Sequence, residues 1–278
     1  VVQVYDVNEF DGRPHFTLEY CPGGSLHEYL HRKPQPAQVC AQILERLALG
    51  VQHAHESGII HRDLKPANVL VSADFGIQGE SQSESGGSTG TEDRQKAFHS
   101  ALRTPHSELL KITDFGLAKN LESSVQATGS LDVMGTPSYM APEQGTSTKK
   151  ADARADVWSL GVVLYEAITG SLPFVGADRF ETYLNACEKD PVPPSEKVKC
   201  PRDLETICLK CLRKDPRERY QTALALADDL RAFLDERSIS ARPMGRIEKS
   251  YKWVKKNPRV SLLLTLFVLT LVSGTVVS

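Results

Sequence analysis

The side chains best suited to chemistry in this sequence lie close together, at residues 61–68. This stretch reads His-Arg-Asp-Leu-Lys-Pro-Ala-Asn and places a carboxylate at Asp63, an ammonium group at Lys65 and a carboxamide at Asn68. Asp63 could accept a hydrogen bond from a substrate hydroxyl and orient it for attack. Lys65 could offset negative charge that develops on a transferred group. The spacing therefore indicates a reaction that needs a positioned hydroxyl beside a positive charge.

A further acidic residue, Asp114, begins an Asp-Phe-Gly string that follows an apolar, strand-like segment at 109–113. Together with the neutral oxygen of Asn68, its carboxylate would suit a hard, oxygen-seeking cation such as Mg²⁺. The same three letters also occur at 74–76, only six residues after Asn68, which leaves no room for a strand, a turn and a second strand. We therefore assign the cation ligand to Asp114.

The periodicity of the apolar residues predicts short strands and a larger number of helices that position these strings. Residues 151–169 are apolar on nearly all sides, which indicates a buried helix, and Gly170 is well placed to end it. The other predicted elements are strands within 1–5 and 16–20, a short helix from Ser25 to His31, a helix at 36–56, a short strand ending at 71, a strand at 109–113, and helices at 176–187, 202–213 and 221–235.

Bulk composition excludes several classes of protein. Of the 278 residues, 40% are hydrophobic and 24% charged, which is typical of a soluble globular body, and the net charge of -2 argues against a nucleic-acid binder. The six cysteines are scattered through a chain long enough to bury its own core, so we expect no disulfide framework. Cys208 and Cys211 have metal-ligand spacing, but they lie in an amphipathic segment without a second such pair, so we interpret them as core residues.

A third string, Ala-Pro-Glu at 141–143, completes a recognisable order. The three strings resemble the catalytic loop, the magnesium loop and the end of the activation segment of eukaryotic-like protein kinases. Over roughly residues 1–235 the chain is similar to the bacterial Hanks-type serine/threonine protein kinases, particularly the membrane-anchored, receptor-like type. The resemblance implies an α+β, protein-kinase-like fold with a mostly helical large lobe and a remnant of the β small lobe. It also implies transfer of the ATP γ-phosphoryl group to Ser/Thr hydroxyls of protein substrates, with ATP and Mg²⁺ as cofactors.

The resemblance also assigns roles to individual residues. Asp63 and Lys65 would be catalytic, while Asn68 and Asp114 would hold the metal ion. The nucleotide would be bound by the gatekeeper Leu18, by the backbone of the hinge at Glu19 and Cys21, by the apolar floor residue Leu70, and by Lys65 at the γ-phosphate.

Regulation is implied by the residue before the catalytic aspartate. Arg62 would pair with a phosphate on the activation segment, for which the resemblance points to Thr128 and Ser130. Thr136, in a Gly-Thr pair typical of the serine/threonine branch, would contact Asp63 and Lys65.

Three further residues are implied to have structural roles. Asp156, at the start of the buried helix, would brace the catalytic loop. Arg219 would form a buried ion pair with Glu143.

Two features depart from the family's pattern. The 278 residues contain no GxGxxG loop, and the strand lysine and helix glutamate that accompany it are also missing, so the match begins at the family's fourth strand. We interpret this as a truncation and expect residues 1–278 alone to be inactive. Residues 72–108 form an insertion that we expect to be disordered. The missing lysine leaves open an alternative, a pseudokinase that binds or scaffolds without phosphoryl transfer.

The end of the sequence differs in composition from the rest. Residues 260–277 form an uncharged run of 18 residues, long enough to cross a bilayer core of about 30 Å. The segment 236–259 before it is basic and carries two aromatic residues, as expected beside a membrane. We therefore predict a single-pass transmembrane helix at 260–277 in the cell membrane, with the kinase domain at 1–235 in the cytoplasm. This receptor-like layout would also suit a homodimer.

Overall fold

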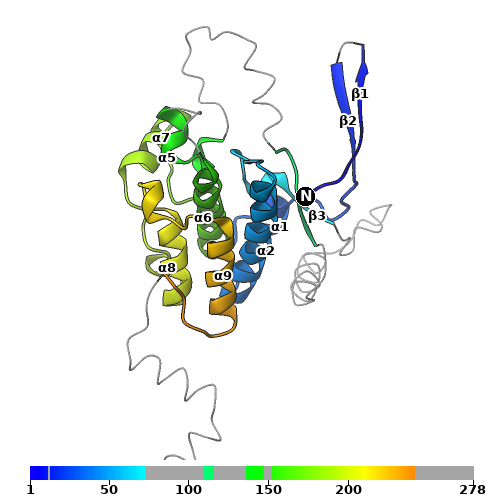
Figure 1. Cartoon of the computed structure of the whole chain (residues 1–278). Coiled ribbons are helices and arrows are strands. Elements are labelled where there is room, and N and C mark those ends of the chain that lie inside the picture. The colour runs from blue at the N-terminus through cyan, green and yellow to red at the C-terminus, as the bar shows by residue number, and fades with distance from the viewer. Residues whose placement is uncertain (12, 73–108, 116–135, 147–151, 242–278) are drawn as a thin grey trace, which may run out of the picture.

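The computed structural model describes residues 1–11, 13–72, 109–115, 136–146 and 152–241. Two small antiparallel hairpins accompany a larger body of helices, so the architecture is α+β (Figure 1). The strands are β1 (Val4–Phe10), β2 (Arg13–Leu18), β3 (Val69–Val71) and β4 (Leu110–Ile112). The helices are α1 (Leu26–Leu30), α2 (Ala37–Glu56), α5 (Pro142–Thr146), α6 (Ala153–Thr169), α7 (Arg179–Glu188), α8 (Arg202–Cys211) and α9 (Ala223–Leu234).

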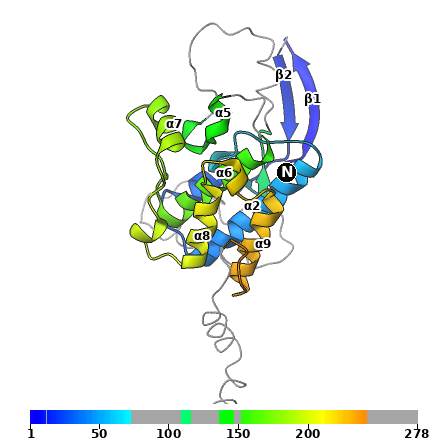
Figure 2. The same cartoon turned by 60° about the vertical axis from the view of Figure 1, so that its left-hand side comes forward.

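The first hairpin, β1–β2, projects away from the helical body in both views (Figures 1 and 2). Asp11 adopts a positive φ of 52° at its turn, as the Asp-Gly pair in the sequence predicts. The large apolar side chains of this hairpin are exposed, from 41% at Phe16 to 78% at Phe10. Two strands were predicted here and two are present, but they run over Val4–Phe10 and Arg13–Leu18, not within 1–5 and 16–20 as predicted. Little of their surface packs on the rest of the described chain.

The second hairpin, β3–β4, lies against the helical body and places the sequence strings next to one another. Its register pairs Val69 with Ile112 and Val71 with Leu110. The catalytic-loop string at 61–68 ends directly before β3 begins, and Asp114 follows two residues after the end of β4. The choice of Asp114 agrees with this pairing, while residues 74–76 lie outside the described part of the chain.

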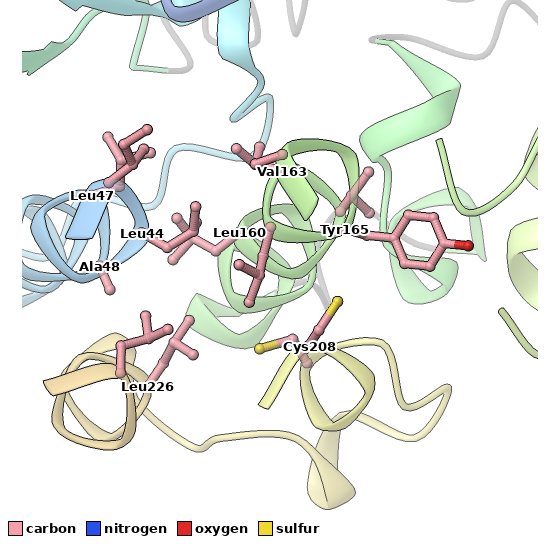
Figure 3. Packing of buried hydrophobic residues seen from close by; sticks show 14 of the residues in the cluster. Leu44, Leu47, Ala48, Leu160, Val163, Tyr165, Cys208 and Leu226 are labelled. Atoms are coloured by element: carbon pink, nitrogen blue, oxygen red, sulfur yellow. The ribbon is translucent and has the colours of Figure 1, made fainter. Parts of the chain in front are cut away.

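The core is built around α6, which the sequence predicted to be buried on all sides. Leu160 and Val163 of this helix face Leu44 and Leu47 of α2, while Leu226 of α9 closes the same cluster (Figure 3). Every residue of α6 from Ala155 to Thr169 is buried. Gly170 then ends the helix in the left-handed region, with φ 70°. The central helix thus forms the rigid support for the loops around it.

Cys208 and Cys211 of α8 are both fully buried in this core and unpaired. Among the described residues, no group of three or more His, Cys, Asp or Glu side chains could hold a metal ion. The interpretation of these two cysteines as core residues is confirmed.

Several helix boundaries follow from capping side chains. Ser25 and Glu28 form a capping box at the start of α1, as the sequence predicted for Ser25. Helix α7 begins at Arg179, three residues later than predicted, because the Asp178 carboxylate accepts the Glu181 N–H at 2.7 Å. The periodicity missed α5 because its five residues are too short to show a pattern.

No helix in the described part of the chain is long and apolar enough to cross a membrane. The predicted membrane span at 260–277 and most of the basic segment before it lie outside the described residues. Residues 73–108 of the predicted insertion at 72–108, and the predicted phosphorylation sites Thr128 and Ser130, lie outside them as well.

Candidate active site

Three side chains predicted to meet do so at the centre of the site. The Lys65 ammonium group donates to Asp63 Oδ2 at 2.8 Å and to Thr136 Oγ1 at 2.9 Å. The Thr136 N–H points at Asp63 Oδ1 from 3.4 Å. The Asp63 and Lys65 side chains keep 31% and 23% of their surface exposed. A charged pair is therefore held in a defined orientation and still reaches solvent, where a substrate could approach.

The amide of Asn68 is oriented by the loop that contains Asp63. Its Nδ2 donates to the Asp63 carbonyl oxygen at 2.9 Å, and the residue is 6% exposed. Because the nitrogen is used inside the loop, the Oδ1 atom remains as the acceptor that Asn68 can offer to a ligand. No described residue donates a hydrogen bond to it.

Asp114 lies beyond the end of β4 with its side chain exposed. Its φ of 60° is unusual for a residue with a side chain, and Arg62 in the catalytic loop has a similar φ of 65°. Such backbone conformations cost about 1–3 kcal/mol and persist only where surrounding contacts enforce them. Arg62 precedes Asp63 directly, and Asp114 follows Thr113, whose N–H donates to the Asn68 carbonyl at 2.9 Å. Both unusual conformations therefore lie beside the Asp63–Asn68 string.

Asp156 braces the catalytic loop, as the family resemblance implied. Its fully buried carboxylate accepts the N–H groups of His61 at 2.9 Å and Arg62 at 2.8 Å. His55 Nε2 makes a third contact with it at 2.7 Å. A buried carboxylate is stable only when its oxygens are satisfied in this way. The loop is therefore anchored to the central helix α6.

The ring of His61 connects the catalytic loop to the segment that carries Asp114. Its Nε2 donates to the Thr113 carbonyl at 2.9 Å, and its Nδ1 accepts the Asp63 N–H at 3.3 Å. The Phe115 ring packs on it with centroids 4.8 Å apart. Because one nitrogen donates and the other accepts, these contacts select the tautomer with the proton on Nε2. His61 thus aligns the two halves of the site.

Two contacts attach the end of the activation segment to the body. The guanidinium group of Arg219, whose side chain is fully buried, forms a bidentate pair with Glu143 at 2.7 and 2.9 Å. This ion pair confirms the prediction. Gln144 was not predicted: it donates to the Arg62 carbonyl and accepts the Ala141 N–H, each at 2.9 Å.

The predicted hinge joins β2 to α1. Leu18 is 41% exposed, Cys21 is half-buried, and burial raises the pKa of the Cys21 thiol. Leu70, the predicted floor residue, is half-buried in β3. The hinge also contains a contact that the sequence did not reveal, between the Glu19 carboxylate and Lys111 of β4, at 2.7 Å.

The contacts that the sequence did not predict share one property. His55 lies 101 positions from Asp156, and Glu19 lies 92 positions from Lys111. No spacing rule applies over such distances. The only available signal was residue type, because charged residues in largely apolar strands and helices are rarely buried without a partner.

The comparisons with known proteins agree with this geometry. The protein kinase domain family matches residues 1–230. The serine/threonine-protein kinase PknB of Mycobacterium leprae is 33% identical over 236 residues, which cover 83% of this chain and 32% of that protein. The probable serine/threonine-protein kinase CPE1738 of Clostridium perfringens is 33% identical over 242 residues, or 86% of this chain and 30% of that protein. The chain thus spans about a third of the length of these relatives.

A solved structure shows the same fold. The crystal structure of Rad53 1-466 in complex with AMP-PNP superposes with a TM-score of 0.60 over 82% of this chain and 49% of that one, at 22% identity. The fold is therefore protein-kinase-like. With the family match over residues 1–230 and relatives that are serine/threonine kinases, the chain belongs to the protein kinase family.

Proposed function

We propose that this chain supplies the large lobe and hinge of a serine/threonine protein kinase, which transfers the ATP γ-phosphoryl group to Ser/Thr hydroxyls of protein substrates. The observation that supports it best is the arrangement of Asp63, Lys65 and Thr136. A solvent-reaching carboxylate held by an ammonium group and an N–H can accept the proton of an incoming hydroxyl and direct its oxygen. The alternative, a pseudokinase scaffold, would not require this orientation.

The residues that would hold Mg²⁺ fit a hard cation. Asn68 offers its amide oxygen, because its nitrogen is used by the Asp63 carbonyl, and Asp114 offers an exposed carboxylate. Both are oxygen ligands, as magnesium prefers. When bound with ATP, the ion supplies positive charge beside the phosphate oxygens. The chain's own contribution is to keep Asn68 and Asp114 in position through the contacts of Asp63 and His61.

The nucleotide base would lie between the hinge and β3. The backbone of Glu19 and Cys21 would form hydrogen bonds with adenine, Leu18 would limit the depth of the pocket, and Leu70 would pack beneath the base. Lys65 would lie near the γ-phosphate, because its ammonium group lies beside Asp63, where the substrate hydroxyl would bind.

Arg62 would sense phosphorylation of the activation segment. The side-chain Nε of Arg62 is buried and has no hydrogen-bond partner among the described residues. The backbone of Arg62 is fixed, because its N–H donates to Asp156 and its carbonyl accepts from Gln144. A phosphate on Thr128 or Ser130 would satisfy this guanidinium group. Thr136 already contacts Asp63 and Lys65, so movement of this segment would reach the catalytic residues.

The decisive experiment is the Asp63→Asn substitution in the full protein, measured by phosphate transfer from labelled ATP to a protein substrate. We expect a loss of about a hundredfold or more in turnover, because the amide cannot accept the hydroxyl proton. ATP binding and thermal unfolding should change little. Asp235→Asn, which alters an exposed ion pair with Arg237, is the matched control.

Two outcomes would contradict the proposal. Transfer by the Asp63→Asn variant at the normal rate would remove the catalytic role of Asp63. A wild-type protein that binds ATP and transfers nothing would favour the pseudokinase alternative.

We also propose a single-pass membrane location, with the kinase domain on the cytoplasmic side and the span at 260–277 available for pairing of two chains. The uncharged run and its basic flank support it. The 278-residue chain should sediment with membranes and need detergent for release, whereas a chain ending at 241 should not. Recovery of the longer chain in the soluble fraction without detergent would refute this location.

A further inference from the structure

One cross-strand pair connects the floor of the proposed nucleotide site to the hinge. In the β3–β4 register, Leu70 lies directly opposite Lys111. Residues opposite each other in an antiparallel pair project from the same face of the hairpin. The Lys111 side chain therefore extends from the same face as Leu70, the residue proposed to lie under adenine.

From this position Lys111 reaches the hinge. Its ammonium group lies 2.7 Å from Glu19 Oε1 and 2.9 Å from Glu19 Oε2, and the two side chains are only 12% and 22% exposed. The hydrogen bond from Lys111 lowers the pKa of the Glu19 carboxyl group. The same carboxylate also faces the Gln3 N–H at 3.3 Å, while the Glu19 N–H donates to the Gln3 carbonyl at 2.9 Å.

The other end of the hinge is fixed by backbone bonds. The Gly23 N–H donates to the Val71 carbonyl at 3.0 Å, and the Val71 N–H donates to the Gly24 carbonyl at 2.9 Å. Both anchors lead to the same β3–β4 hairpin: Val71 lies in β3 and Lys111 in β4. Residues 20–22 lie between the two anchors.

We propose that the Lys111–Glu19 pair is a positioning device for the nucleotide site, which holds the hinge backbone at the correct height above Leu70 and thereby sets the affinity for ATP. This inference rests on the proposed function of the hinge. The pair does not touch the reacting phosphate. Its effect is to pre-organise the backbone groups of Glu19 and Cys21, so that binding does not have to order them.

The experiment compares single and exchanged charges in the full protein. Glu19→Gln and Lys111→Met each remove the ion pair, and the double variant Glu19→Lys/Lys111→Glu restores it in reverse. Glu45→Gln is the matched control, because Glu45 also forms a long-range pair, with Arg231 at 2.7 Å, away from the site. The measured quantities are the KM for ATP, the kcat, the KM for the protein substrate and the Kd of a fluorescent ATP analogue.

We expect each single variant to raise the KM for ATP and the analogue Kd about five- to tenfold, which is within the usual range for the loss of one hydrogen bond. The kcat and the substrate KM should stay within about twofold of wild type, since the transferred group is untouched. The exchanged pair should recover most of the affinity, and Glu45→Gln should leave it unchanged.

Unchanged KM and Kd values in both single variants would overturn the inference. The inference would also be overturned if both single variants lost kcat and thermal stability while their nucleotide affinity stayed unchanged. That result would indicate a purely structural pair. If the wild type binds the analogue but transfers no phosphate, the enzyme proposal fails, and the Kd series still decides this inference. A wild type that does not bind the analogue would overturn both.

Discussion

At the scale of single residues, Lys214 places its ammonium group over two aromatic rings. Its ammonium group lies 4.1 Å from the ring centroid of Phe174 and 5.1 Å from that of Trp158, and it donates to the Ala186 carbonyl at 2.6 Å. The Arg219 guanidinium group also lies over the Trp158 ring, with its Cζ 4.9 Å from the ring centroid. Burial, with a smaller opposing effect from Asp190, lowers the pKa of Lys214 from 10.5 to about 8.

The lowered pKa predicts a pH-dependent stability. The folded state releases this proton more readily than the unfolded chain, so the free energy of unfolding should rise between about pH 8 and pH 10.5 and remain lower below that window. The full shift would be worth about 3 kcal/mol, which partial exposure reduces to about 1 kcal/mol. Urea unfolding of the wild type and of Lys214→Met at about pH 7 and pH 10 would measure the difference.

The outcome depends on which contact of Lys214 dominates. A wild type that loses stability relative to Lys214→Met as the pH rises would show that the two rings and the carbonyl favour the charged form more than burial opposes it.

At the scale of elements, the central helix α6 depends on one close approach to α8. A Cβ atom added at Gly161 would come within 2.4 Å of Cys211 Cβ and 3.2 Å of Leu212 Cδ2. These distances are too short for packed carbon atoms, and Cys211 lies in the last turn of α8. The absence of a side chain at this position therefore determines how closely the two helices pack.

Gly161→Ala should destabilise the fold by about 1–3 kcal/mol, because α8 would have to move away from α6. Gly50→Ala in α2 is the matched helical control. Its added Cβ would meet only the terminal Cδ1 of Ile112, at 3.3 Å, and alanine favours a helix by about 1 kcal/mol over glycine. Chemical unfolding should separate the two variants. Equal stabilities would mean that the α6–α8 contact can relax without cost.

At the scale of the whole molecule, the described chain combines a dense helical body with an open hairpin. The side chains of α6 are buried almost without exception, whereas every residue of β1 is exposed. Burial and dense packing raise the free energy needed to open a segment locally. The chain should therefore show a steep gradient of local stability from α6 to β1–β2.

Hydrogen exchange followed by mass spectrometry would test this gradient in the full protein. Amides of α6 should exchange slowest, at rates set by global unfolding, and those of β1 should exchange orders of magnitude faster. Protection of β1 as strong as that of α6 would contradict the expectation, and it would show that another part of the protein covers the hairpin.

Local patterns in the sequence were enough to predict most elements and the central residues of the site. Ser25 caps its helix through contacts three residues away, and Asp63, Lys65 and Asn68 lie within one short loop, so their geometry follows from nearby backbone. The roles of Asp156 and Arg219 came from family resemblance, and the structure places both as expected.

Tertiary structure alone decided the contacts between distant parts of the chain. Glu19 meets Lys111, His55 meets Asp156, and Gln144 fixes Arg62, in each case across more than 80 positions. Spacing carries no information at such separations, because the partner is selected by how the helices and hairpins pack. A charge or an amide in the sequence shows that it needs a partner when buried, and only the fold determines which one it meets.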